Sequence, residues 1–548
     1  GLNAVKWAAE HKVAMPHKQI AAAFSARARC AVRHGGRIVL LLPSSLITAP
    51  TNADFLRQLS VSVEIDRIIN LADFRRLLFA KAEHACSILR AFNNPPLENG
   101  RMSGHFQYWM PKVDISFAFN RLTLHDYDAL DISRVALVEG NSILRRRSWG
   151  SSRDDALTKR LGQFTSLKTV KARRGWVTAK GYHMTDGDKT ADPADLLRFR
   201  FLPTSVLNST SAAIDTSLLA AVPVERGVAG IGDTRLYQGP RVLWPDGTSV
   251  EIEVRAGYSD VAFCFNSATG GIAFPDKDEG IAKFVACYLR SSLAKYWLIL
   301  NGYSSTAERA RVSLAEILSL PFIDPEDHGS PETAVKALTM ACEKIAQYQA
   351  LIGTAFAEAA YELVRDGIDE IVFDYFGLTN HERILVEDMV ALSAKSLQPT
   401  SYDELFTPLQ AEIDAKVSST YVKQLEEALG MWSHRRGGNG SISVRCLDRA
   451  GIRTPLDVVH VALRAEGTKQ RQVVVAQTCH ELISVIQDRI SDGTPLNFFA
   501  MPNSTFVLGD DIYIIKPSRV RFWTRSAALR DADELVALVA VGDEGTIH

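Results

Sequence analysis

The N-terminal part of the chain carries hydrophobic positions at the periods of both helices and strands. Residues 17–33 place Ile20, Phe24 and Ala28 on one face at helical spacing, and Gly35-Gly36 ends this pattern. Three apolar runs predict strands: RIVLLLP (37–43), DRIINL (66–71) and ACSILRAF (85–92). The first run is continuously apolar, which is typical of a strand buried on both faces of a parallel α/β sheet. Three strands leave a sheet edge open, so this segment predicts one part of a larger sheet.

The middle of the chain carries shorter strand patterns that are followed by long helical ones. Residues 241–258 predict a hairpin around Pro245-Asp246-Gly247, because these three residue types favour tight turns. Residues 332–365 form one long helical pattern with a single internal glycine. Thr379 and Glu382 have the spacing of a capping box, which predicts the start of another helix.

From about residue 410 the pattern changes to that of an α+β domain. Residues 417–429 predict a helix, and a second helix is expected near 478–491. The run DIYIIKP (511–517) predicts a strand, and a short helix is expected to follow it at the end of the chain.

The composition is that of a globular protein, since 46% of the 548 residues are hydrophobic and 23% are charged. Lys and Arg total 62 against 63 Asp and Glu, so a nucleic-acid partner would have to meet a local basic patch. The seven Cys form no C-x-x-C pair, which argues against a zinc site and favours a reducing cytoplasm. No apolar run reaches the roughly 18 residues of a membrane span. The chain begins with Gly1 and no signal peptide, which indicates a fragment or one segment of a longer polypeptide.

Asn94-Pro95-Pro96 follows the third predicted strand, and these three residues match the start of a known catalytic motif. In amino-group DNA methyltransferases a strand ends in Asn-Pro-Pro-aromatic, where the Asn holds the exocyclic amine of a flipped base and the aromatic stacks on that base. Here Leu97 occupies the aromatic position. A Gly-rich turn from strand to helix, which would bind the cofactor, is also missing upstream, since Gly35-Gly36 ends a helix. Asn94-Pro95-Pro96 is therefore predicted to be a plain turn.

Several segments resemble the adenine-N6 (amino-group) DNA methyltransferases of the gamma class, which belong to restriction-modification and phage-defence systems. The similar segments are MPHKQIAAAF (15–24), RHGGRIVLLLPSSLI (33–47), DRIINLADFRRLLFAKAEHACSILRAFNNPP (66–96), FTSLKTVKARRGWVTAKGYH (164–183), LYQGPRVLWPDG (236–247), ACYLRSSLAKYWLILNGYSSTAERARVSLAEILSLPFIDP (286–325) and GIDEIVFDYFGLTNHE (367–382). They are similar to the part of that family that lies downstream of the catalytic loop. The resemblance covers residues 1 to about 395, and residues 405–548 match no domain that we can name.

The resemblance implies an α/β fold made of several domains. The expected parts are the distal half of a Rossmann-like methyltransferase sheet (1–96), a mixed α/β target-recognition domain that binds DNA (97–330), a helical spacer (331–398) and an accessory α+β domain of unknown role (405–548). The catalytic domain would be completed by a missing N-terminal methyltransferase segment or by a partner subunit.

The resemblance also implies a reaction, in which a methyl group moves from S-adenosylmethionine to the amino group of a flipped adenine in double-stranded DNA. This chain would supply DNA recognition and the far side of the base pocket, while the cofactor-binding motif would lie outside it. Phe79 would stack on the base, with Phe74 as a rival, and either ring could instead belong to the core. The alternative function is that of a non-catalytic DNA-binding specificity or scaffold subunit of a restriction or phage-defence complex.

A basic stretch from Arg145 to Lys180 contains eleven Lys or Arg and only two acids, Asp154 and Asp155. Such a stretch neutralises DNA phosphates where it lines a surface, and the alternative is a solvated face around core tryptophans. The residues predicted to contact DNA are Arg145, Arg146, Arg147, Lys168, Lys171, Arg173, Arg174, Trp176, Lys180, Arg309 and Arg311. Residues 512–535 form a second basic stretch. We interpret it as an amphipathic strand whose charges point outward rather than as a DNA contact.

Overall fold

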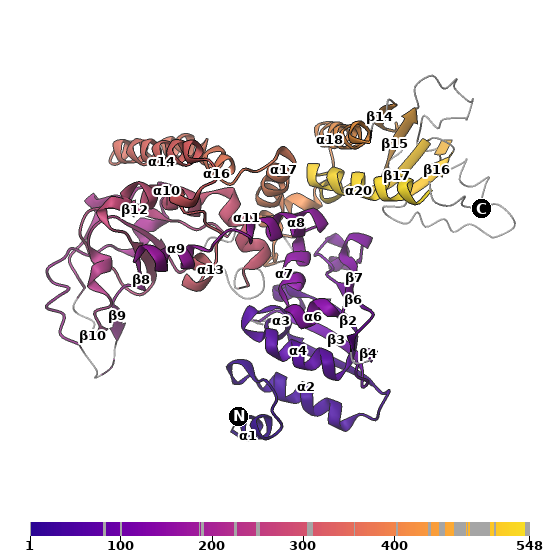
Figure 1. The fold of residues 1–548 in the computed structure, drawn as a ribbon, viewed down its shortest axis with the longest axis horizontal. Coiled ribbons are helices and arrows are strands. Elements are labelled where there is room, and N and C mark those ends of the chain that lie inside the picture. Colours follow the sequence, from indigo (N-terminus) through magenta and orange to yellow (C-terminus); the bar gives the residue numbers. More distant parts are fainter. Residues whose placement is uncertain are drawn as a thin grey trace.

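The computed structural model shows three units, each built around a β-sheet of four or five strands (Figure 1). The N-terminal unit, coloured indigo to purple, the middle unit, magenta to salmon, and the C-terminal unit, orange to yellow, radiate from a helical junction (Figure 1). The junction helices are α7 (Ser142–Trp149), α8 (Ser152–Leu161), α11 (Ser292–Asn301) and α17 (Asn380–Asp388). The structure describes residues 2–79, 84–98, 101–185, 187, 191–223, 227–247, 252–303, 311–355, 357–401, 404–436, 440–448, 455–464, 478, 481–482, 505–508 and 511–542.

The N-terminal sheet has the order β1-β3-β2-β6-β7 and mixes parallel with antiparallel pairs. Its strands are β1 (Arg37–Pro43), β2 (Glu64–Asn70), β3 (Cys86–Phe92), β6 (His105–Trp109) and β7 (Ala129–Ser133). Strand β3 is antiparallel to both β1 and β2, so these two strands run in the same direction, and β6 is parallel to β2. The carboxyl ends of β1, β2 and β6 therefore lie at one end of the sheet. The domain boundary expected at residue 96 is wrong, because β6 and β7 continue this sheet.

Strand β1 forms the edge of the sheet and is buried on one face only. Its residues alternate between exposed and buried, and Val39 and Leu41 are each 58% exposed. The opposite face packs against α2 (Ile20–Ala31) and, through Leu46, Phe55 and Leu59, against the segment that follows β1. The expectation of burial on both faces is therefore wrong. A continuously apolar strand is typical of a complete sheet that is covered on both faces. Among the described residues, only one face of β1 is covered.

Helix α2 packs on β1 through small side chains rather than large ones. Ala22 and Ala23 are buried, whereas Ile20 and Phe24 are 55% and 60% exposed. Of the residues predicted to share one face, Ile20 and Phe24 are thus turned outward, whereas Ala28 is partly buried against the core, because small side chains allow a closer approach to the sheet. The exposed faces of α2 and β1 together leave large apolar side chains uncovered next to the open sheet edge.

The middle unit contains an antiparallel sheet of order β12-β11-β13-β8, covered by helices α10 (Glu279–Arg290), α14 (Pro331–Leu351) and α16 (Ile368–Tyr375). Its strands are β8 (Val177–Lys180), β11 (Arg241–Pro245), β12 (Gly257–Ser259) and β13 (Thr269–Ala273). Arg241 pairs with Ser259 and Leu243 with Gly257, so the expected antiparallel pairing of this region is confirmed. The connection between the two strands is longer than the predicted three-residue turn.

The helical pattern at 332–365 is split into two helices. Helix α14 ends at Leu351, and α15 (Ala357–Arg365) follows after Gly353, which has a φ of +77°. This left-handed conformation is accessible to glycine at little cost and ends a helix. The capping box at Thr379 is confirmed: its side chain accepts from the Glu382 amide, and the Glu382 carboxylate accepts from the Thr379 amide.

The C-terminal unit has an antiparallel sheet of order β14-β15-β17-β16, with helices α18 (Ala415–Arg435) and α20 (Arg525–Gly542) packed against each other. Its strands are β14 (Ser441–Cys446), β15 (Leu456–Arg464), β16 (Thr505–Leu508) and β17 (Asp511–Pro517). Every residue of β17 is buried, including Lys516, so the expectation of outward charges on this strand is wrong. The helix expected near 478–491 lies outside the described residues. No helix in the described part of the chain is both long and apolar enough to cross a membrane.

Candidate functional site

A polar cavity lies where the carboxyl ends of β1, β2 and β6 meet. Thr48, from helix α3 (Ser44–Thr48) directly after β1, lines it together with Asn70 at the end of β2 and Lys112 just after β6. Arg145 and Ser148 of α7 close the other side. The carboxyl ends of parallel strands are where α/β sheets place their ligands. The cavity holds about 20 Å³, which is room for roughly one water molecule.

A hydrogen-bond network holds the wall of this cavity in place. The Asn70 amide donates to the Tyr108 hydroxyl over 2.9 Å and to the Ser148 hydroxyl over 3.2 Å. The Tyr108 hydroxyl in turn donates to the Leu144 carbonyl over 2.9 Å. Burial raises the pKa of Tyr108 to about 12, so this hydroxyl stays protonated at neutral pH. A polar wall organised in this way offers fixed donors and acceptors to whatever lies at the strand ends.

Two buried charges flank the cavity. The Lys112 ammonium donates to the Ser148 carbonyl and lies 4.0 Å from the centre of the Trp149 ring, and burial lowers its pKa to about 8. The Asp73 carboxylate accepts from the Val113 amide over 2.8 Å and from the Gln398 amide over 2.9 Å, and burial raises its pKa. Sequence reasoning missed both residues, because a lone Lys or Asp after a strand carries no recognisable spacing.

The two aromatic candidates for base stacking have different surroundings. Phe74 is 1% exposed and meets the Phe117 ring edge-on, with 5.0 Å between the ring centres. Phe79 follows helix α5 (Arg75–Leu78) and is 48% exposed. Phe74 therefore belongs to the core, and Phe79 is the ring with a free face. It lies in the connection after β2, at the same end of the sheet as the polar cavity.

Asn94-Pro95-Pro96 lies at the opposite end of the sheet, because β3 runs against β1 and β2. The Asn94 side-chain oxygen accepts from the Gly35 amide over 3.0 Å. The neighbouring Asn93 amide donates to the Val32 carbonyl over 2.6 Å, which ties the same turn to the end of α2. The interpretation of this segment as a plain turn is confirmed, since its Asn binds the backbone and lies away from the polar cavity.

The three arginines of α7 do not form a row that faces solvent. The Arg145 guanidinium donates to the carbonyl oxygens of Thr48 and Asn301, over 2.5 and 3.2 Å. Arg146 forms an ion pair of 2.5 Å with Asp155, and Arg147 lines a cavity at the junction of the three units. The prediction that Arg145 and Arg146 bind DNA phosphates is therefore not supported, because both are engaged within the protein.

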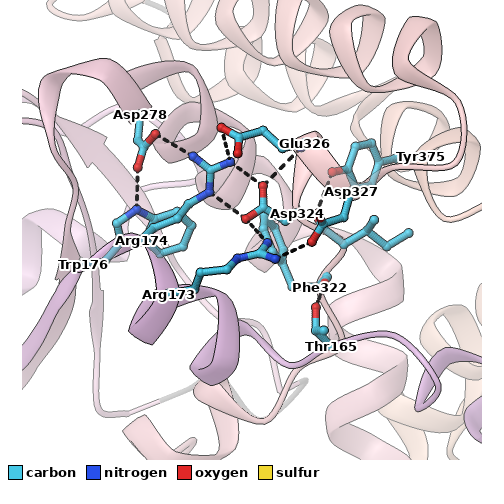
Figure 2. A network of polar contacts seen from close by, with 11 residues as sticks. Thr165, Arg173, Arg174, Trp176, Asp278, Phe322, Asp324, Glu326, Asp327 and Tyr375 are labelled. Carbon is cyan, nitrogen blue, oxygen red and sulfur yellow. Dashed lines mark hydrogen bonds and ion pairs between the residues drawn. The ribbon is translucent and has the colours of Figure 1, made fainter.

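The basic end of helix α9 (Leu167–Arg174) is bound by acidic residues of the middle unit (Figure 2). Arg174 has only 9% of its side chain exposed, and it pairs with Asp278 over 2.9 Å and with both oxygens of Asp324. These hydrogen bonds, first of all those to Asp324, raise the pKa of Arg174. The Trp176 ring is 3% exposed and donates its N–H to Asp278 over 2.8 Å. Arg174 and Trp176 thus belong to the core, and the prediction that they contact DNA is wrong.

The remaining predicted contacts are spread over the middle unit. Arg173 pairs with Asp324 and Asp327 (Figure 2) but keeps 48% of its side chain exposed. Lys168 is exposed on the same helix. Lys171 is half-buried, Lys180 pairs with Asp246, and Arg311 is exposed. Arg309 lies outside the described residues. Lys168, Arg173 and Arg311 are therefore the predicted cations that reach the surface, and their contact with DNA stays a prediction.

No family model and no curated protein matches the chain. Among solved structures it is similar to a Type IIL restriction-modification enzyme, MmeI, in complex with DNA, with 10% identity and a TM-score of 0.39 over 70% of this chain and 52% of that one. It is also similar to the type IIG restriction endonuclease BpuSI, with 10% identity and a TM-score of 0.24 over 65% of this chain and 49% of that one. The chain thus spans about half the length of each of these structures. At such low overlap neither one indicates what this chain does.

Proposed function

We propose that the chain is the DNA-recognition and distal catalytic part of an adenine-specific DNA methyltransferase. The observation that carries this proposal is the half-exposed Phe79 ring at the same end of the sheet as an organised polar cavity, where three parallel strands have their carboxyl ends. A flipped base needs a flat apolar face to replace the stacking that it loses on leaving the duplex. Phe79 would offer that face, and the Asn70–Tyr108–Ser148 wall would offer polar partners at the same end of the sheet.

The open edge of the N-terminal sheet supports a catalytic domain that is shared with another segment. Strand β1 presents its unpaired backbone edge next to the exposed side chains of Val39 and Leu41, and α2 adds Ile20 and Phe24. Further strands from an N-terminal methyltransferase segment or a partner subunit would pair with β1 and cover these side chains.

The described residues do not fit S-adenosylmethionine by themselves. A nucleotide-like cofactor binds where a Gly-rich turn leads from a strand into a helix N-terminus. Strand β1 leads instead into Ser44 and Ser45, and Gly35-Gly36 precedes the strand. The cofactor would therefore bind to the strands that join β1, and this chain would contribute the stacking ring, the polar wall and the DNA contacts of Lys168, Arg173 and Arg311.

Methyl transfer from labelled S-adenosylmethionine to plasmid DNA tests this proposal. The chain should be inactive alone and active within its complete reading frame or with the polypeptide that completes the sheet. Methylation should fall when Phe79 is replaced by Ala and should largely survive Phe79→Trp. Sequence-specific DNA binding without methyl transfer in either context would instead favour the non-catalytic specificity or scaffold subunit.

A further inference from the structure

A second polar cavity, of about 100 Å³, lies at the junction of the three units. It shares Lys112, Ser148 and Trp149 with the cavity at the strand ends. Its remaining wall comes from α8 and α17 and from the C-terminal residues Arg521 to Arg530. By the same measure a water molecule needs roughly 10–15 Å³, so this cavity has room for several waters or for one small polyatomic ion.

Three cations that line the junction cavity have no ion pair among the residues that the structure describes: Lys112, Arg147 and Arg530. Arg147 makes no hydrogen bond within that part of the chain either, and burial lowers its pKa. The Nε atom of Arg530 is buried with no hydrogen-bond partner there, while its guanidinium lies 3.0 Å from the centre of the Tyr127 ring. A buried charge or donor without a partner costs stability, so each of these groups favours an added anion.

The carboxylates that line the same cavity are already engaged. Asp128 pairs with Arg521, and Asp388 pairs with Arg525 and accepts from the amide of Ser526. Asp154 accepts from Ser151 and from the Tyr296 hydroxyl, and burial raises its pKa. None of these acids forms an ion pair with Lys112, Arg147 or Arg530, and four cationic side chains line the cavity against three carboxylates.

The first residues of two helices also line this cavity, although their amides at Ser151 and Ser526 already donate to Asp154 and Asp388. Gly150 and Ser151 lie at the start of α8, and Thr524 and Ser526 at the start of α20. Helix N-termini carry partial positive charge and favour anions. We propose that the junction cavity binds a phosphate group, with Arg147, Lys112 and the Nε of Arg530 as donors and the hydroxyls of Ser148, Thr524 and Ser526 around it.

Phosphate binding here would join the three units, because each supplies part of the site. Lys112 and Arg147 come from the N-terminal unit, Asp388 and Met389 from the end of α17 and the residue after it, and Arg530 from the C-terminal unit. A ligand that binds only the assembled junction stabilises that assembly by RT ln(1 + c/Kd), which increases with the ratio of the ligand concentration c to the dissociation constant Kd. The proposal does not depend on methyl transfer, because inorganic phosphate alone should occupy the site.

The test is a titration of the full chain with inorganic phosphate at constant ionic strength, followed by calorimetry and by thermal unfolding. We expect saturable binding and a rise in melting temperature that chloride at equal ionic strength does not produce. Arg147→Gln should weaken phosphate binding about 10- to 150-fold, as expected for a hydrogen bond to a charged group. Lys423→Gln is the matched control, since it removes one charge from an exposed position of α18, 79% exposed, outside the junction cavity.

Absence of saturable phosphate binding would overturn the proposal, as would equal affinities of the wild-type chain and Arg147→Gln. If Arg147→Gln does not fold, Lys112→Met provides the same comparison. Two further ligands identify the source of the phosphate group. A short DNA duplex that displaces inorganic phosphate assigns the site to the DNA backbone, whereas a nucleoside triphosphate that binds more tightly and resists the duplex assigns it to a free nucleotide.

Discussion

Arg174 in the middle unit and Lys112 at the junction are both buried cations, but they lie in opposite electrostatic surroundings. Arg174 is surrounded by the carboxylates of Asp278, Asp324 and Glu326 (Figure 2). Lys112 meets a carbonyl oxygen and an aromatic ring, and burial lowers its pKa to about 8. The first arrangement stabilises the fold. The second leaves Lys112 without an ion pair in the described part of the chain, as is common where a ligand binds.

The largest effect is expected from removing Arg174. Arg174→Ala leaves the buried Asp278 and Asp324 with fewer partners, which should lower the free energy of unfolding by about 3–5 kcal/mol. Denaturant unfolding measures the loss. Arg235→Ala is the control, because this arginine pairs with Asp233 on the surface with 73% of its side chain exposed. The melting temperature of this variant should differ little from that of the wild type. Equal stability of both variants would show that the acidic cluster does not depend on Arg174.

Phe79 and Phe74 extend the comparison to aromatic side chains. In the complete enzyme Phe79→Ala should lower methylation of duplex DNA about 5- to 150-fold, since stacking one base on an aromatic ring is worth roughly 1–3 kcal/mol. Phe74→Ala should instead lower the free energy of unfolding by about 3–5 kcal/mol. Melting temperature and methylation rate should be measured together on both variants and on Phe79→Trp. A large fall in melting temperature for Phe79→Ala, with activity of the folded fraction intact, would place that ring in the core.

Replacing Lys112 should change the free energy of unfolding in the opposite direction to replacing Arg174. Its pKa falls from 10.5 to about 8 on folding, so the folded state is penalised fully below pH 8 and recovers stability as the pH rises towards 10.5. Lys112→Met should therefore raise the free energy of unfolding at pH 7 by about 1–3 kcal/mol, and the gain should shrink above pH 8. Urea unfolding at several pH values measures this. A variant that is less stable than the wild type at pH 7 would show that the hydrogen bond to Ser148 outweighs desolvation.

The smallest effect concerns the exposed cations of α9. Lys168→Ala should weaken DNA binding to all sequences only a few-fold and should reduce the salt dependence by roughly one phosphate contact. Binding isotherms at several salt concentrations measure the slope. An unchanged affinity and slope for the combined Lys168→Ala and Arg173→Ala variant would show that this face of the middle unit does not meet DNA.

Features that depend on neighbouring residues could be predicted well from the sequence. The strands at 37–43, 66–71 and 85–92 are present, as is the capping box at Thr379. Leu97 in place of an aromatic and the missing Gly-rich turn upstream together indicated that Asn94-Pro95-Pro96 is a turn, and the Asn94–Gly35 hydrogen bond agrees with this interpretation. Each of these features rests on residue types within a few positions of one another, where spacing alone decides the geometry.

The roles of the basic residues depended on the tertiary structure. The stretch 145–180 is basic in sequence, but its positive charges meet acids that the chain brings from far away: Asp278 and Asp324 lie about 100 and 150 positions from Arg174. Local composition cannot show such pairs, because long-range chain packing determines which charges meet. For the same reason, the sequence by itself determined only that Lys112 is a cation that follows a strand and that Arg147 is a cation on a helix. The tertiary structure of the junction decided that neither has an ion pair among the described residues.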